Sequence, residues 1–297
     1  MSTVPLPVEL TIKDIRRAAK RIAPYVVRTP LLRYLLRCDC ELLLKPESLQ
    51  PTGAFKLRGA YNLMLQLPKG CSGVVAHSSG NHAQAVARAA RVLGIPATIV
   101  MPSNAPPQKL ARTKADGAEV IIVGPDSDER AARAGELVAE RGLVLVPPFD
   151  DPRIAAGQGA AALELLQDAG ALDRFYAPVS GGGLMAGCAT AVAALSPGAE
   201  IIAVEPEDAN DTQQSLTAGE RRKVPPPQTI ADGLRVRTPG EWTWTVLKRL
   251  LSRVETVTDD EMIEAMRFAL HELRLVLEPS GAASLALALR EGTGRCG

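Results

Sequence analysis

Hydrophobic and polar positions follow two alternating patterns along most of this chain. From residue 72 onward, short apolar runs rich in β-branched residues alternate with longer stretches that place apolar residues at helical spacing. The first patterns predict strands at 73–77, 97–101, 119–123 and 143–146, and the second predict helices at 81–93, 108–114 and 127–141. An earlier helix is predicted from the capping-box-like Thr11 to Pro24.

A second series of the same kind follows the Pro147–Pro148 pair. It predicts strands at 175–179, 200–205 and 254–257, and helices at 157–168, from 184 onward, and at 259–273. Such alternation predicts an α/β fold with two lobes, each an open, mostly parallel twisted sheet flanked by helices. We expect a large lobe formed by residues 1–70 and 151–297, and a small lobe formed by 71–150. Ligand would bind between them, at the carboxyl ends of the strands.

Composition and charge narrow the function classes. The net charge of +1 and the aromatic content of 3% argue against a nucleic-acid partner. The N-terminus lacks the charged and apolar regions of a secretory signal. The uncharged stretch 177–199 contains Pro178, Ser180 and a triple glycine, which disfavour a membrane span. These features predict a cytoplasmic protein with no membrane partner. We expect reduced thiols at the five cysteines: Cys38, Cys40, Cys71, Cys188 and Cys296.

A lysine follows a turn-rich segment at residues 50–59. Lys56 comes after Phe55, and a helix is predicted over 60–67. An amine held near a helix start and shielded by an aromatic ring would have a lowered pKa, and could act as a nucleophile or a base. An ordinary surface lysine is the alternative that this segment alone leaves open.

Two strand-to-helix turns are candidate anion sites. Residues 78–84 (Ser-Ser-Gly-Asn-His-Ala-Gln) could bind a carboxylate at the helix start, or could simply cap that helix. Residues 180–187 (Ser-Gly-Gly-Gly-Leu-Met-Ala-Gly) could hold a phosphate on backbone amides. The second turn also imitates a dinucleotide fingerprint, with Glu205 at the end of the next strand, although its spacing is one residue too long.

The loop after that strand is acidic. Carboxylates of Glu205 and Asp211, with the backbone carbonyl of Ala209, could bind Mg²⁺ or Ca²⁺. A solvated acidic loop is the alternative.

Taken together, these motifs resemble the fold-type II pyridoxal-phosphate enzymes, in the branch of the serine/threonine dehydratases and serine racemases. The resemblance covers residues 8–288 and also includes Phe149-Asp-Asp-Pro152, Gly157-Gln-Gly159, Ala231-Asp-Gly233 and Glu278-Pro-Ser-Gly281. It implies that Lys56 forms a Schiff base with pyridoxal phosphate and that freed Lys56 takes the Cα proton. It implies the following cofactor-binding residues: Phe55, Lys56, Asn81, Ser180, Gly181, Gly182, Gly183, Leu184, Gly233 and Glu278.

The resemblance also implies a substrate and a reaction. A turn would clamp the carboxylate of an amino-acid substrate, and its residues are Ser78, Ser79, Gly80, Asn81 and His82. L-Threonine or L-serine would lose water and ammonia to give a 2-keto acid. Ser79 matches the second acid/base of the racemases, so an amino-acid racemase is an alternative. Glu205, Ala209 and Asp211 match the family's site for Mg²⁺, Ca²⁺ or Mn²⁺, and a homodimer is expected.

Two positions depart from the family pattern. Ser180 stands where relatives usually have a fourth glycine. Relatives also continue into a final strand whose serine faces the pyridine nitrogen, whereas this sequence ends at Gly297. We therefore expect that strand to be missing, with Ser280 or Ser284 as substitutes for its serine. A non-catalytic cofactor- or phosphate-binding protein is a further alternative.

Overall fold

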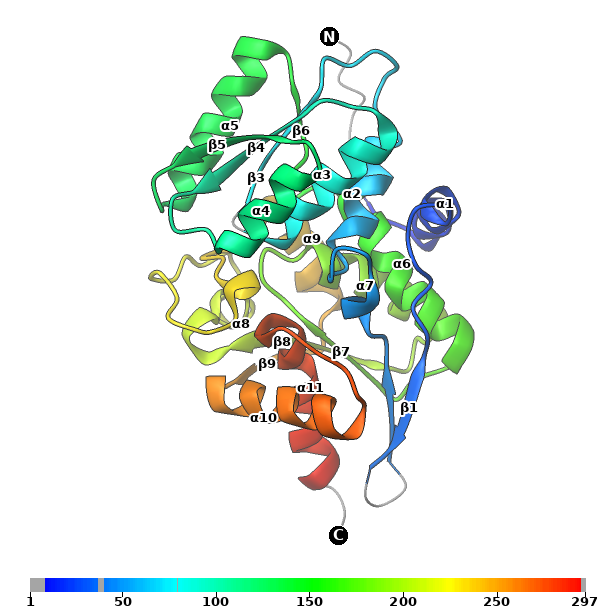
Figure 1. Ribbon diagram of the computed structural model, residues 1–297. Coiled ribbons are helices and arrows are strands. Elements are labelled where there is room, and N and C mark those ends of the chain that lie inside the picture. Colours follow the sequence, from blue (N-terminus) through cyan, green and yellow to red (C-terminus); the bar gives the residue numbers. More distant parts are fainter. Residues whose placement is uncertain (1–8, 37–39, 79, 295–297) are drawn as a thin grey trace.

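The computed structural model describes residues 9–36, 40–78 and 80–294 (Figure 1). Four parallel strands form one sheet in the order β5-β4-β3-β6: β3 (Val74–His77), β4 (Ala97–Pro102), β5 (Glu119–Val123) and β6 (Val144–Leu145). Its helices are α3 (Asn81–Leu93), α4 (Pro107–Ala115) and α5 (Ser127–Arg141). Val75 and Val100 pack against α5, whereas their neighbours Val74 and Ile99 pack in the core that contains α3. Both faces of this sheet are therefore buried, as expected for parallel strands.

The second sheet is also parallel and has the order β7-β8-β9. Its strands are β7 (Arg174–Pro178), β8 (Glu200–Pro206) and β9 (Arg253–Val257). One face packs against α6 (Pro152–Ala169), α7 (Gly183–Leu195) and α9 (Glu241–Leu250). The other packs against α10 (Asp259–Glu272) and α11 (Pro279–Gly294). Figure 1 shows the two sheets at opposite ends of the molecule, with α6, α7 and α9 between them.

The remaining elements connect these layers. Helix α1 (Ile12–Ile22) packs on α6, and α2 (Lys56–Met64) packs between α3 and α6. Strands β1 (Leu32–Leu35) and β2 (Glu41–Leu44) form an antiparallel hairpin, and α8 (Asp211–Ala218) follows β8. Helices α6 and α7 approach so closely that a Cβ on Gly187 would lie 2.1 Å from the carbonyl oxygen of Ala155. Gly187 is therefore needed for helix packing.

The predicted α/β class with parallel sheets is confirmed, and so are most predicted elements. The helix predicted over 60–67 is present, but its predicted bounds are wrong, because α2 begins at Lys56 and ends at Met64. Its buried contacts with α3 and α6 fix these boundaries, and they join residues far apart in sequence. The β1–β2 hairpin was not predicted. The division into lobes at residues 70 and 150 stays a prediction.

Residues 177–199 form the end of β7, a turn and α7. Among the helices of the described residues, none is long and apolar enough to cross a membrane. Three cysteines lie in the described part of the chain, Cys40, Cys71 and Cys188, and all three are free thiols.

Candidate active site

A cavity of about 1720 Å³ lies where the carboxyl ends of β3 and β7 face each other. The start of α2, the start of α11 and the short helix η4 (Asp232–Leu234) complete its walls. It also extends alongside β2 and β7. Apart from Ser79, which lies outside the described residues, it brings together all the predicted cofactor- and substrate-binding residues: Phe55, Lys56, Ser78, Gly80, Asn81, His82, Ser180, Gly181, Gly182, Gly183, Leu184, Gly233 and Glu278.

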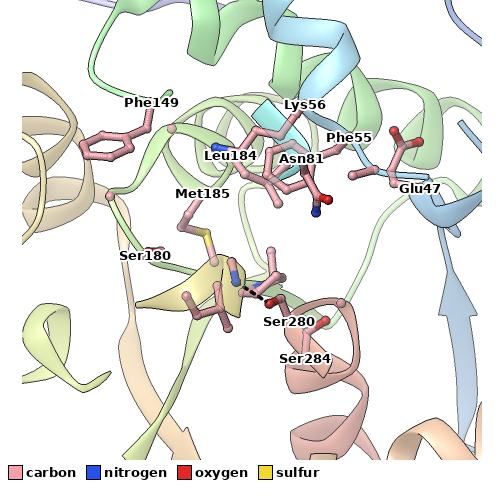
Figure 2. A pocket seen from close by; sticks show the side chains of 18 of the residues that line it. Glu47, Phe55, Lys56, Asn81, Phe149, Ser180, Leu184, Met185, Ser280 and Ser284 are labelled. Carbon is pink, nitrogen blue, oxygen red and sulfur yellow. Dashed lines mark hydrogen bonds between the residues drawn. The ribbon is translucent and has the colours of Figure 1, made fainter. Parts of the chain in front are cut away.

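Lys56 is the first residue of α2, and its side chain enters this cavity (Figure 2). Its Nζ donates to the carbonyl oxygen of Pro148 at 2.7 Å and lies 5.2 Å from the centre of the Phe55 ring. Burial lowers the pKa of Lys56 to about 8, and the nearby Glu278 carboxylate opposes part of this shift. The amine is thus partly neutral near physiological pH, which a nucleophile or base requires.

The glycine turn between β7 and α7 is a candidate anion site. Gly182 has a φ of +96°, and a Cβ there would lie 2.8 Å from Oγ1 of Thr243. At Gly183 a Cβ would lie 2.9 Å from the backbone of Phe149, so neither position has room for a side chain. The first helical hydrogen bond of α7 is donated by Ala186 to Gly182. The preceding amides of the helix's first turn therefore have no intrahelical partner and can bind an anion.

Ser180 at the start of this turn carries a buried hydroxyl with no hydrogen-bond partner. It lines the cavity beside the glycines. A buried hydroxyl without a partner is costly unless a ligand satisfies it. A contribution of the Ser180 hydroxyl to the anion site stays a prediction.

The turn between β3 and α3 is a second candidate anion site. Gly80 precedes α3 without a side-chain cap of its own, and its carbonyl accepts the first helical bond, from Gln84. Ser78 accepts a hydrogen bond from the backbone of Gly80 at 3.1 Å. The ring of His82 is buried and its Nε2 lies 2.8 Å from the carbonyl oxygen of Val146. Burial lowers the pKa of His82 to about 3, so the ring is neutral and anchors the turn to β6.

Sequence reasoning missed two charged residues at this site, Lys109 and Asp232. Lys109 of α4 donates to Oδ2 of Asp232 at 2.6 Å, and its Nζ lies 4.0 Å from Oε2 of Glu278. Glu278 also accepts a hydrogen bond from Nδ2 of Asn81. Burial raises the pKa of Glu278, and Lys109 opposes that shift. The sequence signal that could have found this pair is the Ala-Asp-Gly motif, which carries Asp232.

Two serines of α11 lie across the cavity from Lys56 (Figure 2). Ser280 is buried and its Oγ accepts a hydrogen bond from the amide of Gly233 at 2.9 Å. Ser284 is one helical turn further along and also lines the cavity. Both serines therefore line the same cavity as Lys56, and a role for either one as the ring-nitrogen partner stays a prediction.

The acidic loop forms a separate buried site outside this cavity. The Glu205 carboxylate accepts the amides of Thr212 and Gln213 at 2.9 Å each, and both Asp211 oxygens are buried with no hydrogen-bond partner. Burial raises the pKa of Glu205 to about 7 and that of Asp211 to about 9, and Glu205 contributes to the second shift. Ala209 is buried between them in η3 (Glu207–Ala209).

A cation suits the donor set of this loop, because no positively charged side chain of the described residues forms an ion pair with either of the two neighbouring carboxylates. In the described part of the chain, no three acidic, histidine or cysteine residues gather into a metal cluster. The described residues of this loop offer two buried carboxylates, and a cation bound there with the Ala209 carbonyl stays a prediction. The dinucleotide interpretation is disfavoured, since the Glu205 carboxylate is bound to α8 and Gly187 serves helix packing.

The main cavity fits pyridoxal phosphate on its own chemistry. It places a buried amine of lowered pKa near a glycine turn whose amides and Ser180 hydroxyl lack partners. An aldehyde-bearing phosphate ester matches both features.

Comparisons with known proteins agree with this fit. The pyridoxal-phosphate-dependent enzyme family matches residues 22–294. The L-threo-3-hydroxyaspartate ammonia-lyase of Saccharomyces cerevisiae is 42% identical, over 94% of this chain and 87% of its own length. The serine racemase of Schizosaccharomyces pombe is 40% identical, over 94% and 88%. The solved threonine deaminase of T.th. superimposes with a TM-score of 0.90 at 45% identity, covering 95% of this chain and 94% of that one.

The chain belongs to the family of pyridoxal-phosphate-dependent enzymes. Within it, the fold is of type II, and the chain lies in the ammonia-lyase and racemase branch.

Proposed function

We propose that this chain is a pyridoxal-phosphate-dependent dehydratase that converts L-threonine, L-serine or both into a 2-keto acid and ammonia by α,β-elimination. The observation that carries the proposal is Lys56, a buried amine with a pKa of about 8 in a cavity with two anion sites. One anion site suits the cofactor phosphate and the other suits the substrate carboxylate.

Each residue then has a defined task. The cofactor, when bound, supplies a ring that accepts the electron pair left at the substrate's α-carbon. Neutral Lys56 takes the α-proton, and the turn at Ser78, Gly80 and Asn81 orients the carboxylate. The amides after Gly182 and the Ser180 hydroxyl hold the phosphate. Release of the β-hydroxyl as water commits the substrate to elimination.

Serine racemisation is the second candidate function. The 40%-identical Schizosaccharomyces pombe relative, a serine racemase, supports it. It requires a second acid/base on the face opposite Lys56, for which the sequence offers Ser79. If Ser79→Ala removes racemisation while elimination survives, the two-face assignment is supported; loss of neither activity argues against it.

Further features complete the proposal. We propose that residues 71–150 form a small lobe and that residues 1–70 with 151–297 form a large lobe. We also propose that the protein is a cytoplasmic homodimer. Glu205, the Ala209 carbonyl and Asp211 would bind Mg²⁺, Ca²⁺ or Mn²⁺. A non-catalytic cofactor-binding protein is the outcome if the loaded protein turns over no substrate.

The test is a keto-acid assay on purified, cofactor-loaded protein. L-Threonine, L-serine and L-threo-3-hydroxyaspartate are compared with and without Mg²⁺, and the remaining serine is analysed for the D-enantiomer. Keto acid from threonine or serine supports the dehydratase. Release of keto acid from hydroxyaspartate alone would mean that hydroxyaspartate, and not threonine or serine, is the substrate. Formation of D-serine without keto acid would favour the racemase.

A further inference from the structure

One side chain from the four-stranded sheet's helices crosses the cavity to the opposite wall. Lys109 of α4 contacts Asp232 in η4 at 2.6 Å and lies 4.0 Å from Glu278, which directly precedes α11. Both partners are far from Lys109 in the sequence, and Asp232 follows it by 123 positions. Only 20% of the Lys109 side chain and 31% of the Asp232 side chain are exposed. The ion pair therefore joins two distant parts of the chain and is partly buried.

The same ammonium lies against the β3–α3 turn. A Cβ built on Gly80 would be 3.0 Å from Nζ of Lys109, so the amine lies beside the turn proposed to hold the substrate carboxylate. Asn81, the next residue, donates to the second oxygen of Glu278. Two groups on the α3–α4 side, Lys109 and Asn81, thus hold two carboxylates on the η4–α11 side, and they share Glu278.

We propose that Lys109 is a positioning residue that closes the α3–α4 side over the cavity and couples this closure to amino-acid binding at the Gly80 turn. The inference rests on the proposed function for the identity of the ligand. Lys109 holds Asp232 and Glu278 across the cavity and thereby keeps Asn81 aligned. Its ammonium also offsets the repulsion that these two carboxylates would exert on a substrate carboxylate at the turn, so the substrate binds better while the closed arrangement is in place.

The strength of the coupling follows from the setting of the charges. An exposed ion pair contributes little, because water screens it and the side chains lose entropy. Here one ammonium faces two carboxylates in a partly buried space, where charge-assisted hydrogen bonds are stronger. Lys56 is a second cation that acts on Glu278, and its effect on that carboxylate is smaller than the effect of Lys109.

The kinetic test compares Lys109→Met with Lys114→Met. Lys114 is on the same helix but is exposed and lines no part of the cavity. In cofactor-loaded protein, we expect Lys109→Met to raise KM for the amino acid about tenfold while kcat changes less than KM. The affinity for pyridoxal phosphate should change less than KM, because the phosphate site is untouched. Kinetics equal to those of Lys114→Met would overturn the proposal.

A double-mutant cycle then tests the partner. If Lys109 acts through Asp232, Asp232→Asn in the Lys109→Met background should add almost nothing to the rise in KM. Lys109→Arg keeps a cation beside both Gly80 and Asp232 and should retain a KM closer to that of the wild type, which also separates lost contact from misfolding. Fully multiplicative effects of the two single changes would contradict the coupling.

Hydrogen exchange provides a readout that does not depend on turnover. Amides of α4 and of the segment around Asp232 should exchange faster in Lys109→Met than in Lys114→Met, with the cofactor bound in both. Unchanged exchange in these segments would overturn the closing role. If the wild type turns over no amino acid, the proposed function fails, but the exchange comparison still decides whether Lys109 holds the two sides together.

Discussion

Two sets of buried charged groups in this chain differ in how their charges are balanced. The first surrounds Arg58, which is completely buried. Its Nε contacts Glu47 at 2.7 Å and its Nη1 contacts Glu164 at 2.7 Å, while Lys45 contacts the other oxygen of Glu164 at 2.6 Å. Two cations therefore face two carboxylates. This cluster joins β2, α2 and α6 and holds the start of α2, which has no side-chain cap.

The second set lacks such balance. Asp211 has no hydrogen-bond partner for either carboxylate oxygen, and its neighbour Glu205 is a second carboxylate. Lys56, two residues before Arg58, donates to a neutral carbonyl. Burial shifts the pKa of each of these three groups toward its neutral form.

The difference separates groups that hold the fold from groups available for chemistry. A balanced buried cluster satisfies its charges internally and has nothing left for a ligand. An unbalanced group costs stability, and the cost is recovered only when a ligand, a cation or a reacting centre meets it. Lys56 and the Glu205–Asp211 pair are of this second kind.

The largest expected effect is on turnover, in Lys56→Ala. We expect complete loss of keto-acid release, because no other lysine lines the cavity within the same first turn of α2. The free energy of unfolding should be unchanged or higher, since the variant removes a desolvated amine. Activity assays and urea unfolding measure the two effects. Activity equal to that of the wild type would refute the role of Lys56 in turnover.

The balanced cluster gives the largest effect on stability. Arg58→Met leaves two buried carboxylates without their guanidinium and should lower the free energy of unfolding by about 3 to 5 kcal/mol. Urea unfolding measures it, with Lys114→Met as an exposed control. A loss below about 1 kcal/mol would show that the cluster does not hold the fold.

The unbalanced carboxylates of Glu205 and Asp211 predict that the stability of the fold decreases as pH rises and increases when a divalent cation is added. Their pKa values are raised to about 7 and about 9, so the folded chain binds more protons than the unfolded chain above about pH 4. Their contribution to stability is therefore lost as pH rises from there through 7 and 9. Mg²⁺ should raise Tm at pH 8 by at least about 3 °C.

Asp211→Asn is the matched control for that measurement. It removes one charge with little change in shape, so it should flatten the fall of Tm with pH and abolish the response to Mg²⁺. An equal Mg²⁺ shift in wild type and Asp211→Asn would move the cation site elsewhere.

The smallest effect concerns Ser180, whose hydroxyl is neutral but also unpaired. Ser180→Ala should weaken pyridoxal-phosphate binding about five- to tenfold through loss of one hydrogen bond to an anion. It should leave Tm of the cofactor-free chain equal or slightly higher, because an unsatisfied group is removed. Fluorescence titration with the cofactor measures the first effect. Unchanged affinity would mean that the backbone amides hold the phosphate alone.

The sequence predicted the parts of the site that depend on local chemistry. Lys56 and the two turns follow from short motifs at strand ends, and the structure brings them together in one cavity. The sequence did not predict the balanced cluster around Arg58 or the Lys109–Asp232 pair. Arg58 and Glu164 are 106 residues apart and Lys109 and Asp232 are 123 apart, so only tertiary packing shows which charges meet. The start of α2 was missed for the same reason.

The central claim is that Lys56 is the residue that bonds the cofactor. Cofactor-loaded protein is reduced with borohydride, digested, and each of the nine lysines is examined by mass spectrometry for a pyridoxyl group. The account predicts a yellow protein whose colour disappears on reduction and a single modified peptide that contains Lys56. A colourless protein, or a pyridoxyl group on another lysine with Lys56 unmodified, would contradict it.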